Sequence, residues 1–192
     1  VRAFNAWDLK DLADHIDWTP FFASWELIGR YPLILEDEIV GEAARDLFRD
    51  AQAMLGQIIE EEWLTANAVF GLFPVTRENE DIAFVGADGT ALMAWYGLRQ
   101  QQERPDGKPQ QSLADFVAPT GDYAGAFAVT AGIGIERKLA EFEAQHDDYR
   151  AIMLKTLADR LAEAAAEWLH REVRTKYWGY AAAEKLTNEE LI

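Results

Sequence analysis

Apolar side chains recur at helical spacing near both ends of the chain. Residues 7–16 predict a short amphipathic helix, and residues 36–64 carry a longer apolar stripe at spacings of three and four that predicts a second helical region. Residues 136–177 contain no glycine or proline and keep the helical period. They predict one long helix, or two helices with a break near Asp147 and Asp148.

The period changes in the middle of the chain. Apolar runs there have the length of short strands and are bounded by turn residues such as Asp88-Gly89. They cover residues 68–74, 81–85, 91–97 and 123–130. Residues 125–132, flanked by glycines, are expected to form a buried central strand. The polar residues 99–112 predict a loop. Because helices come first, strands next and a long helix last, the order favours an α+β fold with an antiparallel sheet.

Asp17 lies in a segment rich in aromatic residues. Thr19 followed by Pro20 is typical of an N-cap and a first helical position, and Gly29 is typical of a C′ position, so a helix is predicted between them. Asp17 would sit at the mouth of this helix and accept hydrogen bonds from free backbone N–H groups. Alternatively it meets a cation, because an ionised carboxylate among apolar rings needs donors or a positive partner.

Composition narrows the classes of function. The chain has 34 acidic and 18 basic residues, so its net charge of −16 repels nucleic acids and anionic lipids and tolerates cationic ligands. The absence of Cys excludes disulfides and thiolate sites and fits a reducing compartment. No uncharged apolar run of about 18 residues predicts a membrane span. The first residues have neither Met nor a signal-peptide layout, as after a cut inside a longer cytoplasmic protein.

Two Glu-x-x-His motifs raise the possibility of a di-iron site. Glu143–His146 and Glu167–His170 match the motif of di-iron helix bundles. In one continuous helix the two histidines would be roughly 36 Å apart, too far for one metal pair, unless the chain turns tightly near Asp147. A hard-cation site at Asp147 and Asp148 would need ligands from other segments. We therefore assign no metal ligand. Without a nucleotide fingerprint or a nucleophile with its base, we also assign no catalytic residue.

Glu163 stands out on the last predicted helix because its neighbours are small. Ala162 and Ala164–Ala166 allow another element or a ligand to approach the helix backbone, so a carboxylate there can face a cation. The alternative is an ordinary solvated glutamate on a helix surface.

An ordered set of motifs resembles a known family. The motifs span nearly the whole chain: Asp17-Trp18-Thr19-Pro20-Phe21-Phe22, Tyr31-Pro32, Leu113-Ala114-Asp115-Phe116-Val117-Ala118-Pro119, Gly125-Ala126-Phe127-Ala128-Val129-Thr130, His146-Asp147-Asp148-Tyr149, Leu157–Ala164 and Trp178-Gly179-Tyr180-Ala181. Each is weak alone, but the ordered set is specific. The chain resembles the activation (reactivation) domain of cobalamin-dependent methionine synthase.

The resemblance implies a C-shaped α+β domain with a twisted antiparallel sheet, flanking helices and one long C-terminal helix. Residues 1–192 would be most of this S-adenosylmethionine (SAM)-binding domain, truncated before its final part. In the family, the domain presents SAM for reductive methylation of cob(II)alamin, and the parent enzyme transfers a methyl group from 5-methyltetrahydrofolate to homocysteine. Cobalamin and zinc belong to other modules. The implied partners are the cobalamin-binding domain of the same enzyme and flavodoxin or a similar reductase.

The resemblance also implies which residues hold the ligand. Asp17 and Glu163 match positions that line the family's SAM site, and Asp17 suits the ligand's ammonium through charge-assisted hydrogen bonds. The family motif Arg-Pro-Ala-Pro-Gly-Tyr, which supplies an arginine for the ligand's carboxylate, does not occur in residues 1–192. A helix expected to begin at Thr187 would precede it. We therefore expect residues 1–192 alone to bind SAM weakly or not at all.

The sequence also allows an alternative function. It is a non-enzymatic module that docks on a corrinoid protein or its reductase without binding SAM. Docking to an acidic reductase would need a local basic patch, for which the sequence offers two candidate groups, each also explained as a solvated surface. They are Arg99, Arg104 and Lys108 in the polar loop, and Arg171, Arg174 and Lys176 on the long helix.

Overall fold

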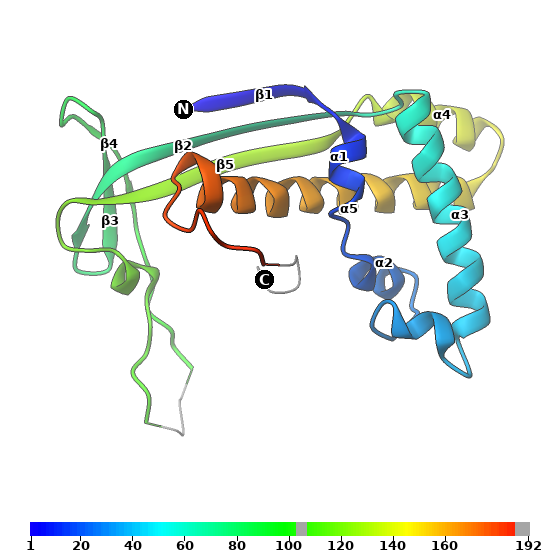
Figure 1. The fold of residues 1–192 in the computed structure, drawn as a ribbon, viewed down its shortest axis with the longest axis horizontal. Helices are drawn as coiled ribbons and strands as arrows, with labels where there is room; N and C mark the ends of the chain where they lie inside the picture. Colours follow the sequence, from blue (N-terminus) through cyan, green and yellow to red (C-terminus); the bar gives the residue numbers. More distant parts are fainter. Residues whose placement is uncertain (103–106, 187–192) are drawn as a thin grey trace. The chain divides into compact units, whose positions relative to one another are not determined.

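The computed structural model describes residues 1–102 and 107–186. Its strands and helices follow the predicted order, with an additional strand at the N-terminus (Figure 1). The elements are β1 (Arg2–Trp7), α1 (Leu9–Ala13), α2 (Trp18–Ser24), the 3-10 helix η1 (Leu33–Glu36), α3 (Gly41–Glu60), β2 (Thr65–Glu78), β3 (Asp81–Val85), β4 (Ala91–Trp95), the 3-10 helix η2 (Leu113–Phe116), β5 (Asp122–Ile133), α4 (Ile135–Ala144), α5 (Asp148–Glu172) and the π-helical turn η3 (Val173–Tyr177). The helix expected at Thr187 lies outside the described residues.

The chain divides into two compact units. Residues Val1–Ala3 and Val69–Phe127 form one, which contains β3, β4 and η2 and is called the strand unit here. Residues Phe4–Ala68 and Ala128–Ile192 form the other, which contains helices α1 to α5 and is called the helical unit.

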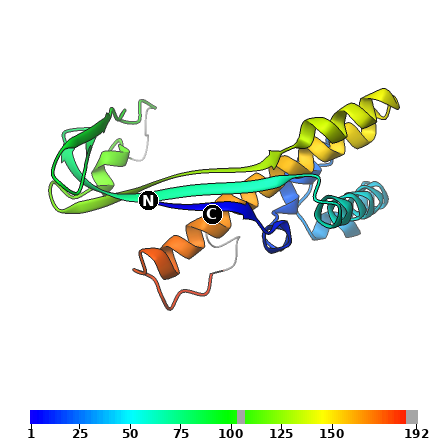
Figure 2. The same cartoon turned by 90° about the horizontal axis from the view of Figure 1, so that it is seen from above.

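The core of the helical unit is built on α5. Helices α1, α2, α3 and α4 all pack against α5, and Figure 2 shows α4 beside its first turns. The side chains at the centre of this core are large and fully buried: Leu12, Phe21, Phe22, Ile58, Leu157 and Leu161. Because these positions come from elements far apart in the sequence, the burial of apolar surface holds the segment around α2 against α5.

The predicted long helix is two helices, as one of the two interpretations allowed. Helix α4 ends in a Schellman motif, in which the N–H of Asp147 donates to the carbonyl of Phe142 (2.9 Å) and His146 is left-handed, with a φ of 55°. Asp147 then caps α5 by accepting from the N–H of Arg150 (3.0 Å). The break therefore needs neither glycine nor proline.

The predicted ends of the aromatic helix were wrong. The N-cap of α2 is Asp17, not Thr19, and the helix ends before Gly29. Glu26 takes the left-handed position after the helix, with a φ of 61°, and the N–H of Leu27 donates to the carbonyl of Phe22 (3.0 Å). Gly29 instead lies against Ile34, where an added Cβ would be 2.8 Å from Cγ1.

Two expectations for the sheet were also wrong. Strand β2 continues through Pro74 to Glu78, and its residue pairs with β3 begin at Val75, beyond the proline. Strand β5 is neither central nor buried: β2 pairs with β1, β3 and β5, and the side chains of Tyr123 and Phe127 are exposed. The apolar character of the β5 sequence therefore does not correspond to burial, since its large side chains Tyr123, Phe127 and Ile133 are exposed.

The strand unit has its own small core and a polar clamp. Strands β2, β3 and β4 pair in antiparallel order, and the core residues are Val75, Ile82, Phe84 and Ala114. Arg99 donates two hydrogen bonds to Asp115 (2.7 and 2.9 Å) and one to Glu80 (2.7 Å). These bonds hold the pKa of Asp115 well below its ordinary value, with a smaller contribution from the backbone N–H of Ser112. The clamp fixes η2 beside the β3–β4 hairpin.

The position of Leu157 predicts a large loss of stability on truncation. Leu157 is fully buried on α5, so Leu157→Ala should lower the free energy of unfolding by about 2–5 kcal/mol, through lost burial and the cavity that remains. Ile152 lies on the same helix but is half exposed, so Ile152→Ala should cost less than about 1 kcal/mol. Urea unfolding followed by circular dichroism measures both. Equal losses would contradict the assignment of Leu157 to the core.

Candidate functional site

Asp17 lies in the segment between α1 and α2, directly before the first residue of α2. Its Oδ1 accepts from the backbone N–H of Thr19 (2.9 Å), which fixes the direction of the carboxylate at the N-terminus of α2. The next residue, Trp18, is buried and packs edge-on against Phe21 and Phe48. The capping interpretation of Asp17 is therefore confirmed. Because Asp17 itself is only partly buried, it also remains reachable from solvent.

Glu163 is an exposed residue on α5. It forms an ion pair with Arg160, one turn earlier on the same helix. The small residues beside it pack inward, since Ala164 and Ala165 are fully buried. Ala164 and Ala165 belong to the same apolar core as Leu12 on α1 and Phe22 on α2, so these alanines pack among other elements of the helical unit.

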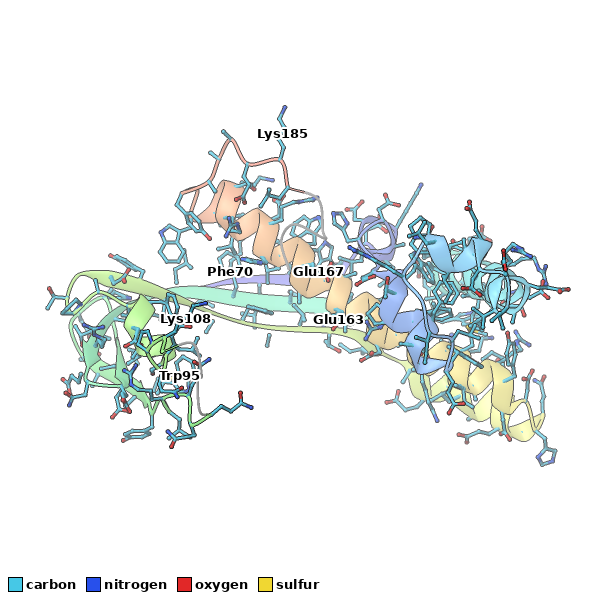
Figure 3. All side chains as sticks on the ribbon, turned by 90° about the horizontal axis from the view of Figure 1, so that it is seen from below. Phe70, Trp95, Lys108, Glu163, Glu167 and Lys185 are labelled. Carbon is cyan, nitrogen blue, oxygen red and sulfur yellow. The ribbon has the colours of Figure 1, made fainter. Side chains whose placement is uncertain are left out.

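Glu167 is the residue of this region that sequence reasoning did not assign to the ligand site. It lies one turn after Glu163, and Figure 3 labels the two side chains on neighbouring turns of α5. Its Oε2 is buried and has no hydrogen-bond partner among residues 1–102 and 107–186. Burial, followed by the negative charges of Asp17 and Glu163, raises the pKa of Glu167 to about 7, against a smaller opposite effect of Arg160.

Asp17, the N-cap of α2, and Glu163, on α5, both contribute through their negative charges to the raised pKa of Glu167, and α2 packs against α5 in the helical unit. We call Asp17, Glu163 and Glu167 the acidic cluster. The spacing of four residues between Glu163 and Glu167 is a signal that could have joined them, because residues four apart lie on one helix face.

The two Glu-x-x-His motifs do not meet. Glu143 and His146 end α4, whereas Glu167 and His170 lie in the last turns of α5. From Asp148 to His170 the chain is one helix, which separates the motifs by roughly 33 Å at 1.5 Å per residue. Across residues 1–102 and 107–186, no group of three or more His, Cys, Asp or Glu side chains is arranged to hold a metal ion.

Comparison with known proteins identifies the family. Residues 8–192 match the family model described as the activation domain of vitamin B12-dependent methionine synthase. The chain belongs to this family. A solved structure described as the MetH reactivation domain bound to AdoHcy (S-adenosylhomocysteine) is 49% identical over 99% of this chain, with a TM-score of 0.92. The chain spans 60% of the length of that structure's chain.

These matches confirm the expected fold class of mixed helices and antiparallel sheet with one long helix late in the chain. Within the part of the chain that the structure describes, no helix has the length and apolar character to cross a membrane.

The raised pKa of Glu167 predicts a pH-dependent stability. The folded-state pKa rises from the ordinary 4.5 to about 7, so the unfolded chain ionises first and stability falls as the pH rises between these values. Above pH 7 the loss is complete. After allowance for solvent screening of a partly exposed group, Glu167→Gln should raise the free energy of unfolding by about 1–2 kcal/mol at pH 8.

Below pH 4.5 the glutamic acid is neutral in both states, so the variant and the natural protein should agree at pH 4. Urea unfolding at the two pH values provides the measurement. The control is Glu143→Gln on α4, where the glutamate is exposed and substitution should change stability at neither pH. If Glu167→Gln lowered the free energy of unfolding at pH 8, the carboxylate of Glu167 would have a stabilising partner in the natural protein and the prediction would be wrong.

Proposed function

We propose that this chain is the donor-binding part of a reactivation domain, and that it holds SAM for the methylation of cobalamin in a B12-dependent methionine synthase. The observation that carries the proposal is the match of residues 8–192 to this family, for which the resemblance implies Asp17 and Glu163 as ligand residues. SAM has a sulfonium and an ammonium but only one carboxylate, so its net charge is positive. A cluster of carboxylates attracts such a ligand, and a partly desolvated one does so more strongly than exposed acids.

The protein's task in this proposal is positioning. Asp17 binds the ammonium of SAM, and its cap bond to Thr19 gives the carboxylate one orientation. Glu163, on α5, provides a second carboxylate for the positively charged ligand. SAM held in this way would supply its methyl group to the parent enzyme's reduced cobalamin and would leave as AdoHcy. Since the sulfonium is already a good leaving group, no described side chain needs to act as an acid or base.

The wider role follows from the family and belongs to the same proposal. Residues 1–192 are most of the SAM-binding domain, and the parent enzyme transfers a methyl group from methyltetrahydrofolate to homocysteine in the cytoplasm. Cobalamin and zinc are held by other modules. The domain meets the cobalamin-binding domain of its own enzyme and flavodoxin or a similar reductase.

The candidate basic patches are largely engaged within the chain. Arg99 is bound by Glu80 and Asp115, and Arg174 forms an ion pair with Glu184. Lys176 pairs with Glu172 (3.0 Å). Arg104 lies outside the described residues. Paired charges attract an acidic partner less than unpaired ones, so a reductase surface at either group would have to compete with these contacts.

Substitution of Asp17 separates the proposal from a docking module without SAM. In the full-length enzyme, Asp17→Asn removes the charge but keeps the cap, because Asn is as good an N-cap as Asp. We expect the rate of reductive reactivation to fall at least about tenfold, as for the loss of a charge-assisted contact. The matched control is Asp8→Asn, since Asp8 caps α1 in the same way, accepting from the N–H of Lys10 (2.9 Å).

Reactivation is measured as recovery of methionine synthesis after oxidation of the cofactor, and unchanged thermal unfolding shows that each variant is folded. A docking module that does not bind SAM predicts equal rates for Asp17→Asn and Asp8→Asn. That outcome would remove Asp17 from the site.

The missing family motif predicts incomplete binding by this chain alone. Residues 1–192 provide carboxylates for the ligand's cations, but the Arg-Pro-Ala-Pro-Gly-Tyr motif is absent from them. Isothermal titration of residues 1–192 with SAM should therefore give a Kd well above that of the full-length enzyme, or no heat. Low-micromolar binding would show that the motif is not needed.

A further inference from the structure

A side-chain hydrogen bond joins the segment before Asp17 to α5. Nη1 of Arg171 lies 2.7 Å from Nε2 of His15, so two residues that are 156 positions apart in the chain are in direct contact. His15 lies between α1 and α2, two residues before Asp17, and Arg171 lies in the last turn of α5. The sequence made Arg171 a candidate for a basic docking patch, but its guanidinium is engaged within the helical unit.

The partners of the His15 ring fix both its tautomer and its direction. Nδ1 lies 2.9 Å from the backbone carbonyl of Asp11, one turn earlier. A carbonyl oxygen only accepts, so these partners assign the ring proton to Nδ1. Nε2 is then the unprotonated nitrogen, and it accepts from the guanidinium of Arg171. One ring nitrogen therefore holds the imidazole to α1, and the other holds it to α5.

The backbone between His15 and Asp17 has little freedom. The N–H of His15 donates to the carbonyl of Leu12 (2.9 Å), which continues the turn after α1. The side chain of Ile16 is buried in the core of the helical unit. Asp17 comes next and caps α2. A contact that fixes His15 on α5 therefore also limits where the carboxylate of Asp17 lies.

Arg171 belongs to the same face of α5 as the two acids. Residues four apart follow one another along a helix face, so Glu163, Glu167 and Arg171 form one row on α5. His15 contacts the last member of this row through a hydrogen bond. The negative charge of Asp17 contributes to the raised pKa of Glu167, the middle member, which agrees with a segment that follows the row.

We propose that His15 and Arg171 are positioning residues for the SAM site, because the hydrogen bond between them sets the place of Asp17 relative to Glu163. This inference rests on the proposed function. Neither residue touches the ligand in this role. A misplacement of about 1 Å is enough to weaken a directed, charge-assisted contact with the ammonium of SAM. The cap bond to Thr19 gives the carboxylate of Asp17 its direction, and the bond from Arg171 to His15 gives it its place.

The test is the affinity of the full-length enzyme for SAM, measured by isothermal titration without a reductant so that no methyl transfer occurs. Arg171→Met removes the donor but keeps a long side chain, and it should raise the Kd of SAM about fivefold, in the range of one lost hydrogen bond. His15→Phe removes the acceptor but keeps a ring, and it should have the same effect. The two substitutions together should weaken binding no more than either alone, because both break the same bond.

Arg150→Met is the matched control. Arg150 also lies on α5, but its guanidinium stacks over the ring of Phe142 on α4 (4.4 Å from the ring centroid) and not on the segment before Asp17. The control should leave the Kd of SAM unchanged. Thermal unfolding shows whether each variant is folded, and His15→Phe provides the test if Arg171→Met is not folded.

A background with Asp17→Asn separates positioning from a general loss of structure. There the contact that His15 and Arg171 position is already lost, so adding Arg171→Met should change the Kd by less than about twofold. The inference is overturned if Arg171→Met weakens SAM binding equally with and without Asp17→Asn, because its effect then does not pass through Asp17.

The same titrations distinguish this inference from the proposed function. If Asp17→Asn leaves the affinity for SAM unchanged, the proposed role of Asp17 fails and the inference falls with it. If Asp17→Asn weakens binding but Arg171→Met and His15→Phe bind SAM as Arg150→Met does, only the inference fails.

Discussion

The packing of α1 and α2 against α5 is the constraint on which the candidate site depends. The fully buried side chains of Phe21 and Phe22 on α2 belong to the same core as those of Leu157 and Leu161 on α5. Each contributes about 2–3 kcal/mol by leaving water, and together they fix one helix against the other. Asp17 precedes α2 directly, so the contacts that hold α2 against α5 also hold Asp17 in the helical unit with the two acids of α5. The charge arrangement is a consequence of apolar packing.

That arrangement opposes the stability of the fold. Three carboxylates around one partly desolvated region repel each other, and Arg160 is the cation that offsets them. Proteins retain such unfavourable groups chiefly where a ligand completes them. The clamp at Arg99 in the strand unit shows the contrast. There Glu80 and Asp115 each accept a hydrogen bond directly from Arg99, so their charges are balanced within the chain. Unbalanced charge is found in the helical unit, around Glu167 and the two residues for which the resemblance implies contact with the ligand.

Sequence predicted the fold where periodicity is strong and failed where ends are set by backbone geometry. The bounds of β3 and the existence of α3 follow from apolar spacing, although α3 is shorter than the helical region expected over residues 36–64. The ends of three helices do not, because Glu26, Glu62 and His146 take the left-handed position that glycine usually occupies. The roles expected of Asp17 and Glu163 came from a resemblance, and the packing of α2 against α5 appears only in the tertiary structure. Glu167 was read only as part of a metal motif, since a sequence shows neither burial nor a missing hydrogen bond.

The way the cluster is built suits a site whose work is to hold a reactive ligand in place. Glu163 and Glu167 project from one rigid helix, and Asp17 is oriented by its own cap bond to Thr19, so none depends on a loop for its direction. A methyl donor that is already activated gains most from fixed orientation, because alignment of the reacting atoms replaces an entropic cost that the reaction would otherwise carry. Such a site can therefore consist of carboxylates on helices.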